Sequence, residues 1–261
     1  MTSVTCVTTR YLPNLRHLAR LHEADVAVLL DLAPLPDRNA NSFVNRNRIF
    51  DRTRDRAAWL TVPIARGRGQ RISDVLIAPG EPQWSEEHID KICALFPAHE
   101  RTAPGFVAAL EEQLANHRPN LLTLNSAINS FLLSKLKHVK HLTLESELVA
   151  QHSSAHRLEI SRAVGATTYV AGEVEWKSME ATGFLELFAR FGIEVVKSPN
   201  PAEVGFDHSM VSDLSCVDAM CRYGVDETSE VLAKMIEIGR VQTKSRTASS
   251  LCVAQRIMSA S

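Results

Sequence analysis

The chain has 261 residues, of which 45% are hydrophobic and 23% are charged. These values are typical of a folded globular protein and exclude an intrinsically disordered chain. The formal net charge is -1, which gives no overall attraction to nucleic acid or to an anionic membrane. We therefore expect no nucleic-acid and no membrane partner; the expectation of a small-molecule substrate comes from the arginine-rich segment and the motifs described below.

The cysteines and the apolar segments predict a cytoplasmic protein. Five cysteines occur at irregular spacings and form no Cys-x-x-Cys pair, so neither a zinc ribbon nor a redox motif is indicated. The N-terminus has no long apolar run typical of a signal peptide, and no apolar run is long enough to span a bilayer. Reduced thiols fit the same compartment.

The first thirty residues predict a strand, a helix and a second strand. Residues 3–8 have high β propensity, and apolar residues recur at helical spacing over residues 14–23. Residues 26–30 form a continuous apolar run that ends at Asp31, which is typical of a central strand of a parallel sheet. The segment has the size of a βαβ unit.

The next part of the chain predicts a long polar loop at residues 32–57, because this segment is rich in Pro, Asn, Asp and Arg. Loops of this length in compact proteins are often functional. Strands are expected at residues 59–64 and 72–77. A helix is expected from Ser85, an N-cap residue followed by two glutamates, to about Leu95.

The second half of the chain alternates predicted helices and strands. We expect helices at residues 106–116, 121–136, 154–164, 179–191, 215–223 and 228–239, and strands at 141–144, 167–171 and 193–197. This alternation predicts an α/β protein with a mostly parallel, Rossmann-like sheet, flanking helices and a helical C-terminal part.

The domain organisation follows from the same pattern. We expect a single α/β domain over residues 1–239, and two lobes at about 1–103 and 104–239 remain an open alternative. Residues 240–261 are rich in Ser, Thr and Arg and predict a tail or a frayed helix.

The sequence contains no common signature of a cofactor or a catalytic centre. A P-loop, a dinucleotide fingerprint, a GxSxG elbow and an HExxH motif are all missing. His152 and His156 are four residues apart, but no acidic ligand lies at a diagnostic spacing, so solvated histidines are favoured over a metal pair. We therefore expect no cofactor and no metal site.

A local excess of arginine stands out against the neutral chain. Residues 38–71 hold nine arginines but only two acidic residues, Asp51 and Asp55. The guanidinium group pairs with phosphate or carboxylate through two parallel hydrogen bonds. Both a pocket for an anionic substrate and a solvated surface loop fit this pattern.

The leading candidate for substrate binding is the run Asn45, Arg46, Asn47 and Arg48. In an extended segment the two asparagines face one side and the two arginines face the other. One pair could therefore line a site, while the other pair faces solvent or binds acidic groups.

Two further candidates follow predicted strands in the first half of the chain. Asp31 ends a central strand, where parallel α/β sheets place their ligand crevice. It is the candidate catalytic residue, since its carboxylate could act as a general base toward an amine or bind the ammonium form; a loop cap is the alternative. Tyr11 could lie over the same crevice or pack in the core.

Three candidates follow strands in the second half. Ser146 and Glu147 come after the strand at residues 141–144 and could either hydrogen-bond a substrate or cap the next segment. Gly172 ends the strand at residues 167–171 and could allow a ligand to approach the backbone closely.

The order of these motifs along the chain resembles the WbqC-like family of bacterial proteins, from about residue 8 to about residue 225. The segments that carry the resemblance are Tyr11–Pro13, Asn45–Ile49, Trp59–Ile64, Glu145–Leu148, Gly165–Gly172, Phe191–Val195, Leu214–Asp218 and Tyr223–Gly224. The combination of NRNRI and WLTVPI is the most specific part.

The chain departs from the family pattern near its N-terminus. Family members typically carry a His-Gln-Pro stretch and a Trp around Tyr-Leu-Pro, and here the segment from Thr8 to Asn14 reads TTRYLPN. The usual lysine of the following helix is Arg20, and the usual Ser-Ser-Glu-Leu reads Glu145-Ser146-Glu147-Leu148. A family histidine that took part in chemistry would be missing here.

The resemblance implies a biosynthetic role. Members of the family occur in gene clusters for O-antigens, other polysaccharides and secondary metabolites. A role proposed for them is the transfer of an acyl or aminoacyl group, such as glycyl, onto an amino sugar. We therefore expect an acyl or aminoacyl transferase with an anionic or sugar-linked substrate, or a metabolite-binding accessory protein without catalysis.

Overall fold

A computed structural model describes residues 2–36, 42–65, 67, 69–78, 83–116, 118–153, 155–198 and 213–240 of the chain. Of the tail expected at residues 240–261, all but the first residue lies outside the described residues. Among the described helices, none is long and apolar enough to cross a membrane.

A five-stranded parallel sheet forms the centre of the fold. Its strands are β1 (Ser3–Val7), β2 (Val26–Leu29), β7 (Thr143–Leu144), β8 (Thr168–Ala171) and β9 (Glu194–Lys197). They lie in the order β7-β2-β1-β8-β9, and each neighbouring pair is parallel. Counted along the chain, this is the order third, second, first, fourth, fifth, which is the arrangement of a Rossmann-like sheet. The predicted fold class is confirmed.

Helices flank the sheet and make up much of the rest of the fold. They are α1 (Leu15–Glu23), α2 (Trp84–Leu95), α3 (His99–Thr102), α4 (Phe106–Ala115), α5 (Leu121–Lys135), α6 (His156–Ala163), α7 (Glu173–Ala181), α8 (Phe184–Arg190) and α9 (Cys216–Tyr223). A further helix covers residues 225–240. The single helix expected at residues 179–191 is therefore wrong. Gly183 has a φ of +72° and separates α7 from α8, since only glycine adopts this backbone conformation without strain.

The polar loop expected at residues 32–57 is wrong for its second half. Strands β3 (Arg46–Asp51) and β4 (Arg56–Thr61) form an antiparallel hairpin there. Burial alternates along β3 with a period of two residues, as in a strand with one face on the core. The strand was not predicted from the sequence because its asparagine and arginine residues are not typical strand formers.

The strand expected at residues 72–77 is also shorter in the structure. It becomes a 3₁₀ turn, η1 (Ile72–Asp74), followed by the two-residue strand β6 (Leu76–Ile77), which pairs with β5 (Ile64–Ala65). A second 3₁₀ turn, η2 (Glu145–Glu147), follows β7 directly.

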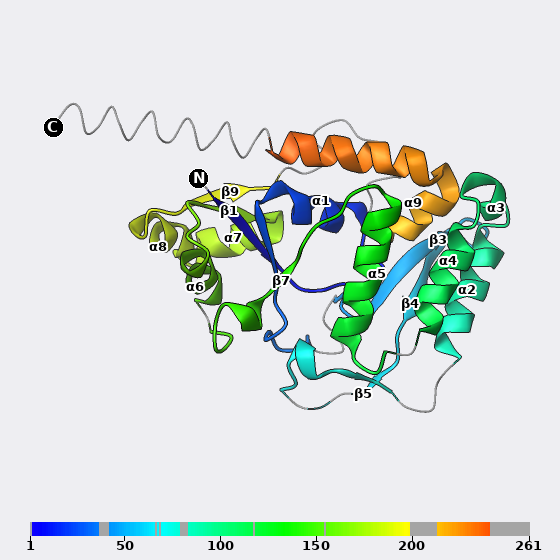
Figure 1. Cartoon of the computed structure of the whole chain (residues 1–261), viewed down its shortest axis with the longest axis horizontal. Helices are drawn as coiled ribbons and strands as arrows, with labels where there is room; N and C mark the ends of the chain where they lie inside the picture. Colours follow the sequence, from blue (N-terminus) through cyan, green and yellow to red (C-terminus); the bar gives the residue numbers. More distant parts are fainter. Residues whose placement is uncertain are drawn as a thin grey trace.

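The helices gather at the two ends of the molecule (Figure 1). Helices α6, α7 and α8 lie at one end, beside β9, and helices α2 to α5 lie at the other, with the hairpin. Helix 225–240 runs along one side, over α1. The two helices approach closely at Gly239, where a Cβ would lie 2.4 Å from Cγ of Glu23, and Arg240 donates to the carbonyl oxygen of His22 over 2.8 Å.

Candidate functional site

A cavity of about 710 Å³ opens at the carboxyl ends of β1 and β8. The chain leaves β1 toward β2 on one side of the sheet and leaves β8 toward β9 on the other. This divergence is the topological switch point, where open α/β sheets bind their ligands. The lining also includes residues of α1, α6, α7 and helix 225–240. We call this cavity the switch-point crevice.

Basic side chains slightly outnumber acidic ones in the lining of the switch-point crevice. The basic residues are Arg10, Arg16, Arg20, Arg157 and Lys177. Several acidic side chains lie among them, so the balance of charge depends on how each pair is arranged.

The centre of the crevice is a buried ion cluster around Glu175. One carboxylate oxygen, Oε2, accepts a hydrogen bond from Nη2 of Arg20, and the other, Oε1, accepts from Nε of Arg157. The hydroxyl of Tyr169 donates to Oε1 over 2.6 Å. Burial opposes ionisation of Glu175, but the two arginines outweigh it and hold the pKa of the carboxyl below its usual value. Two guanidinium groups thus share one carboxylate, and Glu23, which also lines the crevice, acts on Arg20 at longer range.

Arg20 is fixed against the sheet by further contacts. Its Nε donates to the hydroxyl oxygen of Thr5 over 3.1 Å, and its Nη2 donates to the carbonyl oxygen of Cys6 over 3.2 Å. Gly172 lies against the guanidinium group, and its backbone N–H donates to Oε2 of Glu175 over 3.2 Å. Gly172 is also the N-cap of α7, so the N-terminus of this helix opens at the crevice.

Arg10 supplies a further positive charge, with Asp213 acting on it only at longer range. Within the described part of the chain no hydrogen bond or ion pair engages its guanidinium group, which lies 5.5 Å from the ring centroid of Phe43. Burial and the nearby Arg20 lower the pKa of Arg10 to about 10, so the group stays cationic at neutral pH. His17, on the same wall, adds no charge, because burial together with Arg10 and Arg20 lowers its pKa well below the usual value.

Four acidic residues of the lining, Glu23, Glu173, Glu175 and Asp213, compensate most of the charge of its five basic residues and leave a small positive excess. Asp213 lies 3.6 Å from Arg16, and Glu173 lies 3.1 Å from Nζ of Lys177 and 3.5 Å from Nζ of Lys197. The crevice therefore has a cationic centre at the N-terminus of a helix. Such an arrangement binds phosphate or carboxylate groups.

The asparagines of the predicted NRNR run face the core and not the crevice. Nδ2 of Asn45 donates to the carbonyl oxygen of Val62 over 2.9 Å, and Nδ2 of Asn47 donates to that of Leu12 over 2.5 Å. Both side chains are buried. Their amides satisfy backbone carbonyls between the hairpin and the segment after β1.

The arginines of the same run lie on the opposite face of the hairpin, as the alternation predicts. The guanidinium carbon of Arg46 lies 4.7 Å from the ring centroid of Trp59, and that of Arg48 lies 5.7 Å from it. Phe43 stacks on Trp59 and also contacts Arg48 and Arg10. Cation–π contacts thus connect the hairpin arginines to the wall of the switch-point crevice.

Tyr11 is fully buried and does not line the crevice. Its hydroxyl oxygen lies 2.8 Å from Nδ1 of His88. Its ring also packs edge-on against Trp84. Tyr11 therefore occupies the core, which is the second of its two predicted placements.

Asp31 and Ser146 come together at the carboxyl ends of β2 and β7. The backbone N–H of Ser146 donates to Oδ1 of Asp31 over 3.0 Å, and the N–H of Ser73 donates to the Asp31 carbonyl oxygen over 2.9 Å. Glu147 is exposed, and its Oε2 accepts from the N–H of Leu144 over 3.4 Å. Asp31 thus joins two loops, and none of the three residues lines the crevice.

Among the predicted site residues, only Gly172 lines the switch-point crevice. The sequence reasoning missed Arg10, Arg20, Arg157 and Glu175 as functional residues. Arg10 and Arg20 carried a signal, since both lie where the family pattern is altered, and Glu175 follows Gly172 at the third helical position. Arg157 carried no signal that could have found it.

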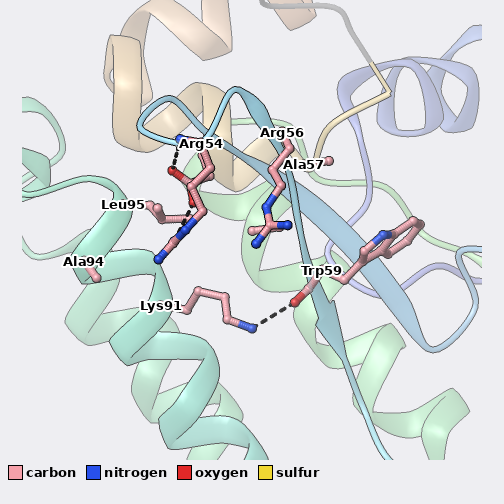
Figure 2. A pocket seen from close by; sticks show the side chains of 9 residues that line it. Arg54, Arg56, Ala57, Trp59, Lys91, Ala94 and Leu95 are labelled. Atoms are coloured by element: carbon pink, nitrogen blue, oxygen red, sulfur yellow. Dashed lines mark hydrogen bonds and ion pairs between the residues drawn. The ribbon is translucent and has the colours of Figure 1, made fainter.

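A second, smaller hollow lies between the hairpin and α2 (Figure 2). Its volume is about 450 Å³, and Arg54, Arg56 and Lys91 supply its positive charge. Arg54 is paired with Asp51 over 2.8 Å, and Lys91 donates to the carbonyl oxygen of Trp59 over 3.0 Å. With two of its three cations engaged, this hollow is a weaker anion site than the switch-point crevice. No cluster of three or more His, Cys, Asp and Glu side chains arranged to hold a metal ion occurs among the described residues.

Comparison with known proteins gives one match. The model of the WbqC-like protein family matches residues 9–230, which confirms the resemblance seen in the order of the motifs. No curated protein and no solved structure matches the chain.

Proposed function

Because the chain belongs to the WbqC-like protein family, we propose that it is a biosynthetic transferase that joins an acyl or aminoacyl group to an amine. The product is an amide on an amino sugar or on another small-molecule amine. The substrate that binds in the switch-point crevice carries a phosphate or diphosphate group, as a nucleotide-linked sugar does.

The observation that carries this proposal is the excess of positive charge in the crevice. Arg10 makes no hydrogen bond or ion pair with an acidic side chain among the described residues and is balanced only at longer range by Asp213. Arg20 and Arg157 share the carboxylate of Glu175. A phosphate group placed there gains charge-assisted hydrogen bonds and lies at the N-terminus of α7. Buried cations without a ligand are costly, so this charge distribution favours an anionic ligand.

The roles of the predicted residues follow from their places in the fold. Arg46 and Arg48 extend the cationic surface from the crevice along the hairpin, and so they are placed to hold a more distant part of the ligand. Asp31 accepts a hydrogen bond from the Ser146 backbone, so in this proposal it holds the loop after β7 in place instead of taking a proton.

The test is a search for turnover with the purified full chain. Acyl thioesters, or amino acids with ATP, serve as donors, and nucleotide-linked amino sugars serve as acceptors. We expect an amide product in mass spectra. Failure to form an amide with every donor and acceptor pair, in the presence of measurable ligand binding, would contradict the transferase proposal.

The cationic crevice is tested by charge removal. Arg10→Gln should raise the KM for the phosphate-bearing substrate at least tenfold, which corresponds to about 1.4 kcal/mol. Arg190→Gln, at an exposed arginine outside the crevice, removes the same charge and should leave KM unchanged. Equal KM values for the two variants would show that the crevice is not the phosphate site.

A metabolite-binding protein without catalysis is the second candidate function. Thr8 and Arg10, which lie where the family pattern has its His-Gln-Pro stretch, are both in the wall of the crevice. Replacement of the family's His-Gln-Pro stretch would change which ligand binds or remove a group that reacts. Saturable binding of a nucleotide sugar in calorimetry, with no turnover for any donor, is the outcome that this second candidate predicts.

A further inference from the structure

A buried carboxylate holds a partly exposed histidine next to the crevice. Glu145 follows β7 and is completely buried, and its Oε1 lies 2.8 Å from Nδ1 of His152. The side chain of His152 is 22% exposed. A buried acid that orients an accessible imidazole is the arrangement that many enzymes use to prepare a proton acceptor.

The pairing determines which imidazole nitrogen is available. As a carboxylate, Glu145 only accepts hydrogen bonds, so Nδ1 of His152 carries the proton and donates it. Nε2 then carries the free lone pair. Within the described residues Nε2 of His152 has no hydrogen-bond partner, and it is not among the buried polar atoms that lack one, so it is at least partly exposed. It is therefore open to solvent and able to accept a proton.

The surroundings of Glu145 and His152 distinguish His152 from the neighbouring His156. The ring of His156 stacks on His152, with centroids 3.8 Å apart. Burial and the nearby Arg157 lower the pKa of His156 to about 4, so this second ring is neutral near pH 7. Burial raises the pKa of Glu145, and the nearby Asp31 adds to this effect, while the hydrogen bond from His152 opposes it. Of the two stacked rings, His152 is the one with an accessible nitrogen.

The pair lies at the same edge of the sheet as the switch-point crevice. Strand β7 is next to β2, and β2 is next to β1, so the carboxyl ends of β7 and β1 are roughly 10 Å apart at the usual strand spacing. His156 is the first residue of α6, and the next residue, Arg157, lines the crevice and binds Glu175. A ligand whose phosphate lies at Arg10 and Arg157 can therefore extend toward His152.

We propose that His152, oriented by Glu145, is the proton acceptor for the substrate amine in the amide-forming reaction; this step rests on the function proposed above. The amine nitrogen attacks the carbonyl carbon of a thioester or an acyl phosphate, and a C–N bond forms. The C–S or C–O bond breaks, and the leaving thiolate or phosphate keeps the electron pair. The proton lost by the nitrogen passes to Nε2 of His152 and then to the leaving group or to water. Glu145 is a positioning residue.

Turnover measurements test the catalytic part of the proposal. His152→Gln should lower kcat about 100-fold or more, the usual contribution of a general base, and should leave the affinity for inorganic pyrophosphate within about twofold. His141→Gln, at an exposed histidine beside β7, is the matched control and should keep full kcat. A His152→Gln variant with the kcat of the control would overturn the proposal.

A second experiment needs no substrate. In ¹⁵N NMR of the full chain, His152 should show the Nδ1–H tautomer above pH 8, and Glu145→Gln should mix the two tautomers, while Glu145→Asp retains a carboxylate and should restore the original form in part. Diethyl pyrocarbonate should modify His152 before the buried His156. An Nε2–H tautomer, or equal reactivity of the two histidines, would overturn the assignment.

The two experiments separate this proposal from the proposed function. If the unmodified protein forms no amide with any pair of substrates, the transferase function fails, and the tautomer measurement still decides whether Glu145 orients His152. If the protein forms an amide and His152→Gln keeps full kcat, the transferase function stands and the role of His152 is rejected.

Discussion

Gly172 and the guanidinium group of Arg20 lie so close together that no side chain fits between them. A Cβ at position 172 would lie 2.8 Å from Nη1 and 3.3 Å from Cζ of Arg20. Carbon atoms of real side chains essentially never come so near, so the absence of a side chain lets the turn from β8 to α7 rest on the arginine. This contact forms the floor of the switch-point crevice.

Gly172→Ala should therefore displace Arg20 from its place beside Glu175. We expect a several-fold loss of affinity for pyrophosphate, measured by calorimetry, since the guanidinium group moves away from the anion site. Gly67→Ala is the control, because the nearest atom to a new Cβ there is 3.8 Å away and no strain is expected. Unchanged affinity in Gly172→Ala would mean that Arg20 does not contribute to ligand binding.

Glu175→Gln should destabilise the protein strongly. The change leaves Arg20 and Arg157 partly buried without their shared counterion, and breaking a buried ion pair from one side typically costs about 3–5 kcal/mol. Urea unfolding at pH 7 measures the free-energy difference. Glu173→Gln is the matched control on the same helix, since its carboxylate is 36% exposed and exposed ion pairs contribute less than about 1 kcal/mol. A similar small loss in both variants would contradict the structural importance of the cluster.

The stability of the protein should fall as the pH falls from about 6.5 to about 4, in part because of His88. Burial, with a contribution from Lys91, lowers the pKa of His88 to about 4. Below its usual value of about 6.5 the unfolded chain binds a proton that the folded protein excludes. The difference between the usual pKa and the pKa in the folded protein corresponds to a loss on the order of 3 kcal/mol in the free energy of unfolding across this window.

Urea unfolding of the unmodified protein and of His88→Asn at pH 7, 6, 5 and 4 measures this effect. The variant should lose less stability over the window, because it has no imidazole to protonate in the unfolded chain. His141→Gln, at an exposed histidine, should retain the full pH dependence. Parallel pH profiles for the unmodified protein and His88→Asn would show that His88 is not the source.

Within the NRNR run, the buried asparagines should contribute more to the free energy of unfolding than the arginines on the opposite face. Asn47→Ala leaves the buried carbonyl oxygen of Leu12 without its donor, so we expect a loss of about 1–3 kcal/mol in the free energy of unfolding. Arg46→Ala removes a stacking contact with Trp59, which contributes about 0.5–1 kcal/mol at a partly exposed site. Thermal or urea unfolding compares the two, and a larger loss for Arg46→Ala would reverse this division.

The sequence alone predicted the class of the fold and the faces of the NRNR run. Val26 to Leu30 form an apolar run that is typical of a strand buried on both faces, and alternating strands and helices imply a parallel sheet. The two faces of the run follow from the two-residue period of a strand, which needs no knowledge of neighbours. The order of motifs was likewise enough to identify the family. The fold class and the two faces of the run depend on residues close together in the chain.

Tertiary structure decided which polar residues meet. Arg20 and Glu175 are 155 residues apart, and they meet because β1 and β8 are neighbours in the sheet, a pairing that local periodicity does not determine. The same holds for Glu145 and His152, whose seven-residue separation crosses a turn that no helix or strand pattern describes. Local hydrophobic periodicity therefore predicted the strands of the central sheet and most of the helices, but not the hairpin of β3 and β4. Only long-range packing decided where the charges converge, because the free energy of a buried ion pair depends on partners that the fold brings together.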